Sequence, residues 1–296
     1  IAEGCDKHCT YCIIPKLRGN YRSVPMEKLL AEAKDLADQG VKELILVAQE
    51  TTVYGKDLYG EKSLHKLLRE LCKISGIQWI RILYCYPEEI YDELIETIRD
   101  EKKICHYLDI PIQHASDRIL KRMGRRTSKQ ELIDIVGKLR KEIPDIVLRT
   151  TLITGFPGET EEDHEELKEF VDEMEFDRLG VFTYSPEENT PAAEMADQVP
   201  EEVKEERRDE LMELQQEISY DRGQDRIGQE LLVMIEGKVA DESAYIGRTY
   251  GDAPKVDGYI FVQTGELLMT GDFAKVRVTG ALEYDLIGVL IDEYTE

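Results

Sequence analysis

The sequence predicts an α/β protein in two parts, an open (β/α)6-type partial barrel followed by a small five-stranded β-barrel. Three observations lead to this prediction. Short apolar runs alternate with long amphipathic, charged segments over the first two thirds of the 296 residues. A very charged segment then begins at Pro200, and short β-like runs with turn residues between them fill residues 228–296. Repeated strand–helix units indicate a parallel sheet covered by helices, here a partial TIM barrel, and closely spaced short strands indicate a small closed barrel.

The first part is expected to contain helices that each precede a strand. The helices are expected over residues 26–39, 63–73, 90–100, 129–141 and 161–175. The strands are expected over residues 41–48, 79–84, 107–112, 146–154 and 179–184. Functional groups in such folds lie at the C-terminal ends of the strands. Polar pairs occur there, at Gln49-Glu50, Gln113-His114 and Thr154-Gly155.

The second part is expected to follow a connecting helix over residues 201–226, in which apolar residues recur at helical spacing. The first domain is therefore predicted over residues 1–222 and the barrel domain over residues 228–296. Strands of the barrel are expected over residues 230–236, 244–248, 258–262, 272–279 and 285–289. The number and length of these strands are typical of oligonucleotide-binding (OB) folds.

The chain is strongly acidic, with 62 acidic and 38 basic residues and a net charge of −24. This charge opposes direct binding to nucleic acid and favours a basic partner. No apolar run approaches the ~18 residues of a membrane span, and no secretory signal begins the chain. These observations predict a cytoplasmic protein without a membrane partner, which we expect to be a monomer. Because the first residue is Ile1 and not Met, we expect a fragment of a longer protein.

The most specific motif is a group of three cysteines, Cys5, Cys9 and Cys12. Thiolates at these spacings suit one loop around a [4Fe–4S] cluster, and three ligands leave one iron open for a small molecule. A zinc site with His8 as a further ligand and a loop of inert thiols are the alternatives. The remaining cysteines lie among apolar residues and are expected to be buried structural thiols: Cys72, Cys85 and Cys105.

This triplet, with the aromatic Tyr11 just before the last cysteine, resembles the radical S-adenosylmethionine (radical SAM) enzymes. The resemblance implies that SAM binds the open iron through its amino and carboxyl groups. One electron from the reduced cluster then splits SAM into methionine and a 5′-deoxyadenosyl radical, which abstracts hydrogen from an unactivated carbon. The protein orients SAM and excludes solvent. Tyr11 is accordingly assigned to the cofactor site.

Further SAM-binding residues are implied by the same resemblance. Glu50 would receive the SAM amino group, although Ala48-Gln49 stands where the family carries Gly-Gly; the alternative is a solvated glutamate at a strand end. Ile153 would flank the adenine, and Gly155 would allow its close approach. Arg149 would pair with the SAM carboxylate or only cap a strand.

Residues 4–19 extend the resemblance to the methylthiotransferase branch of the superfamily. Members of this branch combine a radical SAM barrel with a small β-barrel domain called TRAM. They also carry an N-terminal domain whose three cysteines hold a second [4Fe–4S] cluster. That domain is not in this sequence, so the chain is expected to be incomplete for full turnover.

The branch contains enzymes that modify an adenosine of tRNA and a member that methylthiolates the β-carbon of an aspartate in small-subunit ribosomal protein twelve. Residues 108–116, 197–207 and 252–258 resemble the protein-modifying member. Residues 228–296 contain 13 acidic and 5 basic residues, a net charge of −8, which favours a basic ribosomal protein over tRNA. A tRNA adenosine methylthiotransferase and a non-catalytic scaffold that binds the ribosomal protein remain the alternatives. A flavodoxin-type protein is the expected reductant.

His114 lies at the expected C-terminal end of a strand, where it could contact the substrate. A structural histidine with satisfied hydrogen bonds is the equally weighted alternative. No other residue is assigned a catalytic role beyond the cluster.

Overall fold

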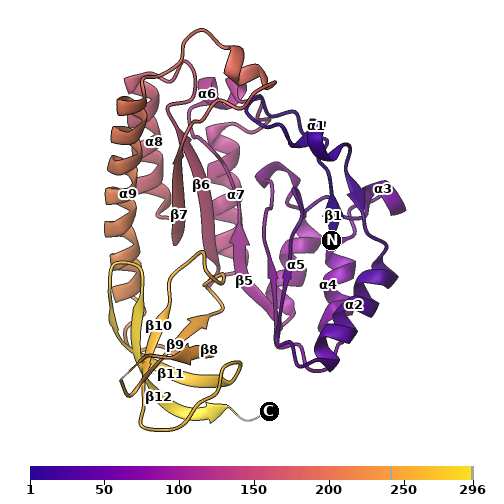
Figure 1. Ribbon diagram of the computed structural model, residues 1–296, viewed down its shortest axis with the longest axis vertical. Helices are drawn as coiled ribbons and strands as arrows, with labels where there is room; N and C mark the ends of the chain where they lie inside the picture. Colours follow the sequence, from indigo (N-terminus) through magenta and orange to yellow (C-terminus); the bar gives the residue numbers. More distant parts are fainter. Residues whose placement is uncertain (241, 295–296) are drawn as a thin grey trace. The chain divides into compact units, whose positions relative to one another are not determined.

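The computed structural model describes residues 1–240 and 242–294, and the chain divides into two compact units, Ile1–Leu214 and Gln215–Glu296. The first unit contains a parallel sheet covered by helices, and the second contains a closed β-barrel (Figure 1). This arrangement confirms the predicted fold class. The division falls within helix α9 (Glu201–Gln224), which is the connecting helix expected from its charge and periodicity.

The main sheet of the first unit has five parallel strands in the order β3-β4-β5-β6-β7. Every neighbouring pair is parallel, so all the C-terminal ends of these strands meet at one edge. Figure 1 shows the helices of the strand–helix units on the outer side of this sheet. The strands are β3 (Glu43–Leu46), β4 (Trp79–Ile82), β5 (Ile104–Asp109), β6 (Val147–Thr154) and β7 (Arg178–Thr183).

The helices that precede these strands bury regularly spaced apolar residues. Helix α4 shows the pattern most clearly, because its buried leucines occur at positions i, i+3, i+4 and i+7 from Leu64. Capping boxes begin two helices, at Ser128 for α7 and at Thr160 for α8. The helices are α2 (Met26–Asp38), α4 (Leu64–Cys72), α5 (Asp92–Asp100), α7 (Lys129–Glu142) and α8 (Glu161–Met174).

The chain enters the first unit through a small hairpin. Strand β1 (Ala2–Glu3) pairs antiparallel with β2 (Arg22–Ser23), and the backbone nitrogen of Ile1 donates to the Val47 carbonyl at 2.9 Å. Strand β1 ends before Gly4, where a φ of 77° turns the backbone. A side chain has no room at this position, because a Cβ atom would lie 2.2 Å from the Asn20 carbonyl oxygen. Strands β1 and β2 thus form a two-stranded sheet separate from the parallel sheet, and the cysteine loop begins directly after β1.

Short helices complete the first unit. They are α1 (Ile14–Arg18), α3 (Lys56–Tyr59), α6 (Asp117–Arg122) and the 3-10 turns η1 (Pro87–Glu89) and η2 (Pro191–Glu194). Among the described residues, no helix is both long enough and apolar enough to cross a lipid bilayer.

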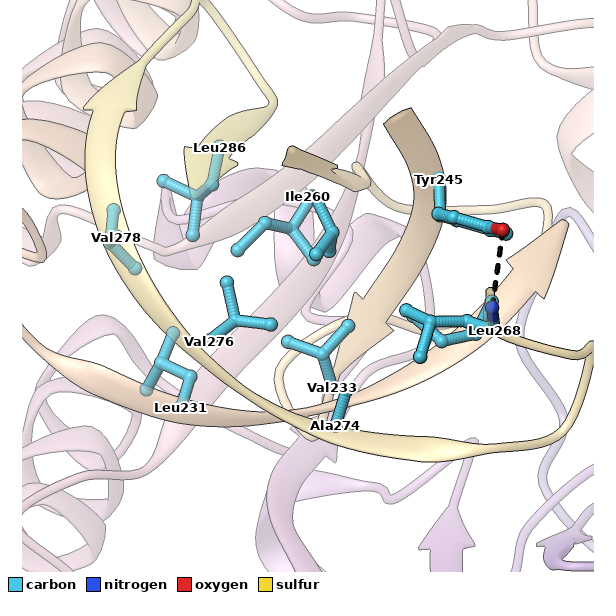
Figure 2. Packing of buried hydrophobic residues seen from close by; sticks show 11 residues of the cluster. Leu231, Val233, Tyr245, Ile260, Leu268, Ala274, Val276, Val278 and Leu286 are labelled. Atoms are coloured by element: carbon cyan, nitrogen blue, oxygen red, sulfur yellow. Dashed lines mark hydrogen bonds between the residues drawn. The ribbon is translucent and has the colours of Figure 1, made fainter. Parts of the chain in front are cut away.

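The second unit is a closed barrel in the order β10-β12-β11-β8-β9. Alternate residues of its strands point inward and form one apolar core, which Figure 2 shows around Val276 and Ile260. The Leu268 backbone nitrogen donates to the Tyr245 hydroxyl at 3.1 Å and connects a loop to this core (Figure 2). The strands are β8 (Glu230–Lys238), β9 (Ala244–Thr249), β10 (Ile260–Gln263), β11 (Phe273–Ala281) and β12 (Leu286–Tyr294).

Candidate cofactor site

The three clustered cysteines lie on the loop between β1 and α1. Backbone hydrogen bonds shape this loop, from Cys5 to the Gly19 carbonyl at 3.2 Å and from Cys12 to the Cys9 carbonyl at 3.1 Å. Thr10 attaches the loop to the end of α6, because its backbone nitrogen donates to the Met123 carbonyl at 2.9 Å. The loop is thus held in one conformation by backbone groups, which leaves the cysteine side chains for other roles.

The cysteine thiols are sheltered from solvent. Cys5 and Cys9 are buried and Cys12 is half-buried, and burial raises the pKa of the Cys5 and Cys12 thiols. Within the described part of the chain, no three histidine, cysteine or acidic side chains are gathered closely enough for a single metal ion, and His8 is exposed. This geometry gives no support to a zinc site. A [4Fe–4S] cluster suits the donor set better, because each thiolate binds a different iron.

Glu50 lies at the C-terminal side of β3 and shares a cavity of about 300 Å³ with Cys5. Its carboxylate is almost completely buried, at 1% exposure. Oε1 accepts a hydrogen bond from the Thr52 backbone nitrogen at 2.8 Å and another from the Thr52 hydroxyl, whereas Oε2 is buried without a partner among the described residues. A buried acceptor with no donor fits an ammonium group in this cavity. The solvated glutamate considered as the alternative is not observed.

The environment of Glu50 favours its neutral form until a cation arrives. Burial raises its pKa to about 7, although the Thr52 hydrogen bonds and the Lys7 charge act in the opposite direction. A bound ammonium ion would offset the cost of burying the negative charge and lower the pKa of Glu50, so that the carboxyl group ionises. The other lining residues of the cavity are mostly polar: Asp6, Lys7, Tyr21, Val53, Lys56, Asp57, Glu89 and Arg126.

Tyr11 and Ile153 pack against the same apolar cluster beside the cysteine loop. The Tyr11 ring meets the edge of Phe156 at a centroid distance of 6.4 Å, and Phe156 in turn contacts Tyr184 at 5.3 Å. Burial raises the pKa of Tyr11, so its hydroxyl stays protonated. The structure thus brings together two residues that the sequence assigned to SAM, and adds Phe156, which the sequence did not single out.

Arg149 lies in β6 and is held by the neighbouring strand β5. Its Nη1 donates to Asp109 Oδ1 at 2.8 Å and to the Thr151 hydroxyl at 3.3 Å. Asp109 also accepts from the Tyr84 backbone nitrogen at 3.3 Å. Since Tyr84 has a φ of 62°, this aspartate supports a strained turn at the end of β4 as well as the arginine.

The space beside Gly155 is filled by Lys204, and the expected approach of adenine to this glycine stays a prediction. Its φ is 67°, and a Cβ atom at this position would lie 2.1 Å from Cγ of Lys204 in α9. Lys204 is buried, and its ammonium donates to the Tyr184 carbonyl at 2.8 Å. The missing side chain therefore allows α9 to pack against the end of β6.

His114 is completely buried, and its expected contact with the substrate stays a prediction. Its Nδ1 accepts from the Ser116 backbone nitrogen at 3.0 Å, and its Nε2 lies 3.4 Å from Glu159 Oε2. Glu159 is buried as well and pairs with Arg207 of α9 at 2.9 Å. The chain from His114 through Glu159 to Arg207 holds the turn after β6, which is the structural alternative for this histidine.

Three residues around Cys9 were not found from the sequence. The Tyr86 hydroxyl lies 3.7 Å from Cys9 Sγ, and the Arg125 guanidinium lies 4.3 Å from the centre of the Tyr86 ring. The Lys7 ammonium is 5.2 Å from the same centre. Tyr86 follows the predicted strand 79–84, so the rule that functional groups follow strand ends could have identified it. No local pattern distinguishes Arg125.

The other cysteines form no disulfide. Cys85 and Cys105 are buried in the first unit, as expected of structural thiols, and Cys72 is half-buried. Burial raises the pKa of the Cys72 thiol to about 11 and raises that of Cys85 further. Neither Cys72 nor Cys85 is therefore activated as a nucleophile.

Comparisons with known proteins place these features in context. The family described as the Radical SAM superfamily matches residues 1–171, and the TRAM domain matches residues 227–291. The ribosomal protein uS12 methylthiotransferase RimO of Lachnoclostridium phytofermentans is 69% identical over 288 residues, covering 97% of this chain and 66% of that protein. The RimO of Clostridium botulinum strain Langeland is 55% identical over 296 residues, covering 100% of this chain and 66% of its own length. The chain thus spans about two thirds of these relatives.

Two solved structures resemble the chain at low sequence identity. The radical SAM methyltransferase TsrM from Kitasatospora setae, with cobalamin and a [4Fe–4S] cluster bound, has a TM-score of 0.54 at 18% identity, over 64% of this chain and 37% of that one. Coproporphyrinogen III oxidase (HemN) from Escherichia coli has a TM-score of 0.52 at 16% identity, over 93% of this chain and 65% of that one. These similarities support the fold.

Proposed function

Because the chain belongs to the radical SAM superfamily, we propose that it is the catalytic core and substrate-docking domain of a methylthiotransferase. The observation that carries this proposal is the cavity that Cys5 and Glu50 line together, in which Glu50 has a buried oxygen without a hydrogen-bond partner among the described residues. The acceptor on the proposed protein substrate is the β-carbon of an aspartate in ribosomal protein uS12, the molecule named in the relatives.

The proposed cofactors match the donor atoms of the site. Cys5, Cys9 and Cys12 would hold a [4Fe–4S] cluster, and Glu50 Oε2 would accept a hydrogen bond from the SAM ammonium. Bound there together, the cluster and SAM would supply one-electron cleavage of SAM into methionine and a 5′-deoxyadenosyl radical that takes hydrogen from the substrate. The residues of the chain bind and orient: Tyr11 and Ile153 supply an apolar wall beside the loop.

Arg149 remains the proposed partner of the SAM carboxylate. Its side chain is 17% exposed, and the ion pair between its Nη1 and Asp109 fixes the orientation of the guanidinium group. A planar guanidinium suits a carboxylate because two parallel N–H donors match its two oxygens. Burial around the cysteine loop limits the access of water to the reacting groups.

A basic protein is the proposed partner because the second unit is acidic. Its expected net charge of −8 over residues 228–296 would attract a ribosomal protein and repel tRNA phosphates. Direct binding to nucleic acid is therefore not part of the proposal. We also propose that the longer protein carries a second [4Fe–4S] cluster on an N-terminal domain, receives electrons from a flavodoxin-type reductant, and acts as a cytoplasmic monomer.

Anaerobic reconstitution of the chain tests the cluster. We expect about four irons per chain and the absorbance of a [4Fe–4S] cluster, both lost in Cys9→Ala and retained in the matched variant Cys72→Ala. A stoichiometric tetrahedral zinc, or iron binding that survives Cys9→Ala, would contradict the proposal.

The substrate is tested with a protein of the full length of the relatives that contains this chain. Mass spectrometry should find a methylthio group in place of hydrogen on an aspartate of uS12. The same modification on a tRNA adenosine, with tight tRNA binding that weakens steeply with salt, would establish the tRNA alternative. Binding of uS12 that survives loss of all three cysteines, without any modification of the protein, would establish the non-catalytic scaffold.

A further inference from the structure

A tyrosine from the neighbouring strand end contacts one of the proposed cluster ligands. Tyr86 lies between β4 and η1, and its hydroxyl is 3.7 Å from Cys9 Sγ. A tyrosine hydroxyl is protonated at neutral pH and can donate a hydrogen bond. When Cys9 is a thiolate, the sulfur can only accept, and the tyrosine is the donor.

The Tyr86 ring is contacted by two cations with different surroundings. The Lys7 ammonium pairs with Glu88 and Glu89 at 3.3 and 2.6 Å, so its charge is compensated within the chain. Arg125 is 7% exposed, and its Nη2 donates to the Pro111 carbonyl at 2.9 Å. Its Nε and Nη1 have no hydrogen-bond partner among the described residues, and no carboxylate of that part of the chain forms an ion pair with it.

A buried guanidinium without an anionic partner is unfavourable, because its hydration is lost and not replaced. Two negatively charged groups act on Arg125 electrostatically, the proposed cluster ligand Cys9 and the carboxylate of Glu88. Arg125 lies over the ring of Tyr86, and the hydroxyl of Tyr86 contacts Cys9 Sγ. The positive charge of Arg125 is therefore close enough to stabilise negative charge on that sulfur. Thiolates and the cluster together are anionic, and one added electron makes them more negative still. A fixed positive charge and a hydrogen bond to sulfur therefore stabilise the reduced cluster more than the oxidised one.

We propose that Tyr86 and Arg125 are positioning residues that raise the reduction potential of the cluster, through a hydrogen bond to Cys9 and a buried positive charge. The inference rests on the proposed function, because it requires that the cluster is bound. The electron comes from an external low-potential reductant and enters the cluster, and the two residues remain protonated throughout. They set how readily the cluster accepts that electron, and they do not touch the substrate.

The test is a redox titration of the reconstituted chain, with dithionite as reductant and the electron paramagnetic resonance signal of the reduced cluster as readout. Tyr86→Phe removes only the hydroxyl, whereas Arg125→Gln removes the charge together with the guanidinium contacts to Pro111 and the Tyr86 ring. Both variants should shift the midpoint potential to a more negative value, and Arg125→Lys should restore most of the loss. Tyr91→Phe is the matched control, since the Tyr91 hydroxyl contacts His65 and not the cysteine loop.

A purely structural role predicts a different result, in which apo-chain stability falls and the midpoint potential is unchanged. That result in Tyr86→Phe overturns the inference while leaving the proposed function intact. If the unsubstituted chain binds no iron, both fail together. Should Arg125→Gln not fold, Tyr86→Phe still decides, because loss of one hydroxyl leaves the ring and its packing in place.

Discussion

The variant Glu50→Gln separates two effects of this residue: the cost of ionising a buried carboxyl group in the apo chain, and its contribution to SAM binding. Burial raises the pKa of this carboxyl from its ordinary value of 4.5 to about 7. Glutamine has nearly the shape of the protonated acid, and its carbonyl oxygen can still accept from the Thr52 backbone nitrogen. The substitution therefore removes the ionisation and little else.

The sign and size of the effect follow from the two pKa values. Between pH 4.5 and about 7, folded chains hold a proton on Glu50 that unfolded chains have released. The free energy of unfolding contributed by this group thus falls as the pH rises through that window. A difference of about 2.5 pH units at about 1.4 kcal/mol each amounts to about 3 kcal/mol above the window. Without cofactors, Glu50→Gln should therefore be more stable by about 1 kcal/mol near pH 5.5 and by about 3 kcal/mol near pH 8.

Urea unfolding of the apo chain at both pH values measures this difference, with Glu173→Gln on the exposed face of α8 as the matched control. Whereas the apo variant should be more stable, its affinity for SAM after reconstitution should fall by about 10- to 100-fold. This is the usual effect of losing a hydrogen bond to a charged group. Equal stability of variant and parent at both pH values would refute the account of Glu50 as a buried carboxyl awaiting a cation.

Two further predictions concern the turn after β6. Arg207→Ala should lower the free energy of unfolding by about 3–5 kcal/mol in urea, because it leaves the buried Glu159 without its cation; a loss below about 1 kcal/mol would contradict this. Gly155→Ala should destabilise by at least about 1 kcal/mol, since its φ is positive and its Cβ would clash with Lys204. Gly137→Ala in α7 has open space and should instead stabilise by about 0.5–1 kcal/mol in the same assay; equal effects of the two alanines would count against the packing argument.

Several features could be read from the sequence because they depend on neighbouring residues. The alternation of apolar and amphipathic segments located the sheet strands and helices to within a few residues, as in β6 and α8. The cysteine loop was identified because all its ligands lie within eight residues. Period-two alternation in strands such as β11 likewise specified a barrel with an apolar interior.

The side chains that surround the cysteine loop could not be found in this way. Tyr86 is 77 residues from Cys9 in sequence, and the two meet only because β4 ends beside the loop. The sequence placed His114 at a strand end, but only the packing of α9 decides that it faces Glu159 and not the cavity. Gly155 shows the same limit, since Lys204 fills its open side.

By itself, the sequence determined the order of elements, the three thiols and the acidic character of the chain, because these are local or additive properties. The tertiary structure alone decided which polar groups are buried and which atoms lack partners. Burial and pairing depend on how strand ends and helices meet across long separations, as they do for Glu50, which lines one cavity with Cys5 only in the folded chain.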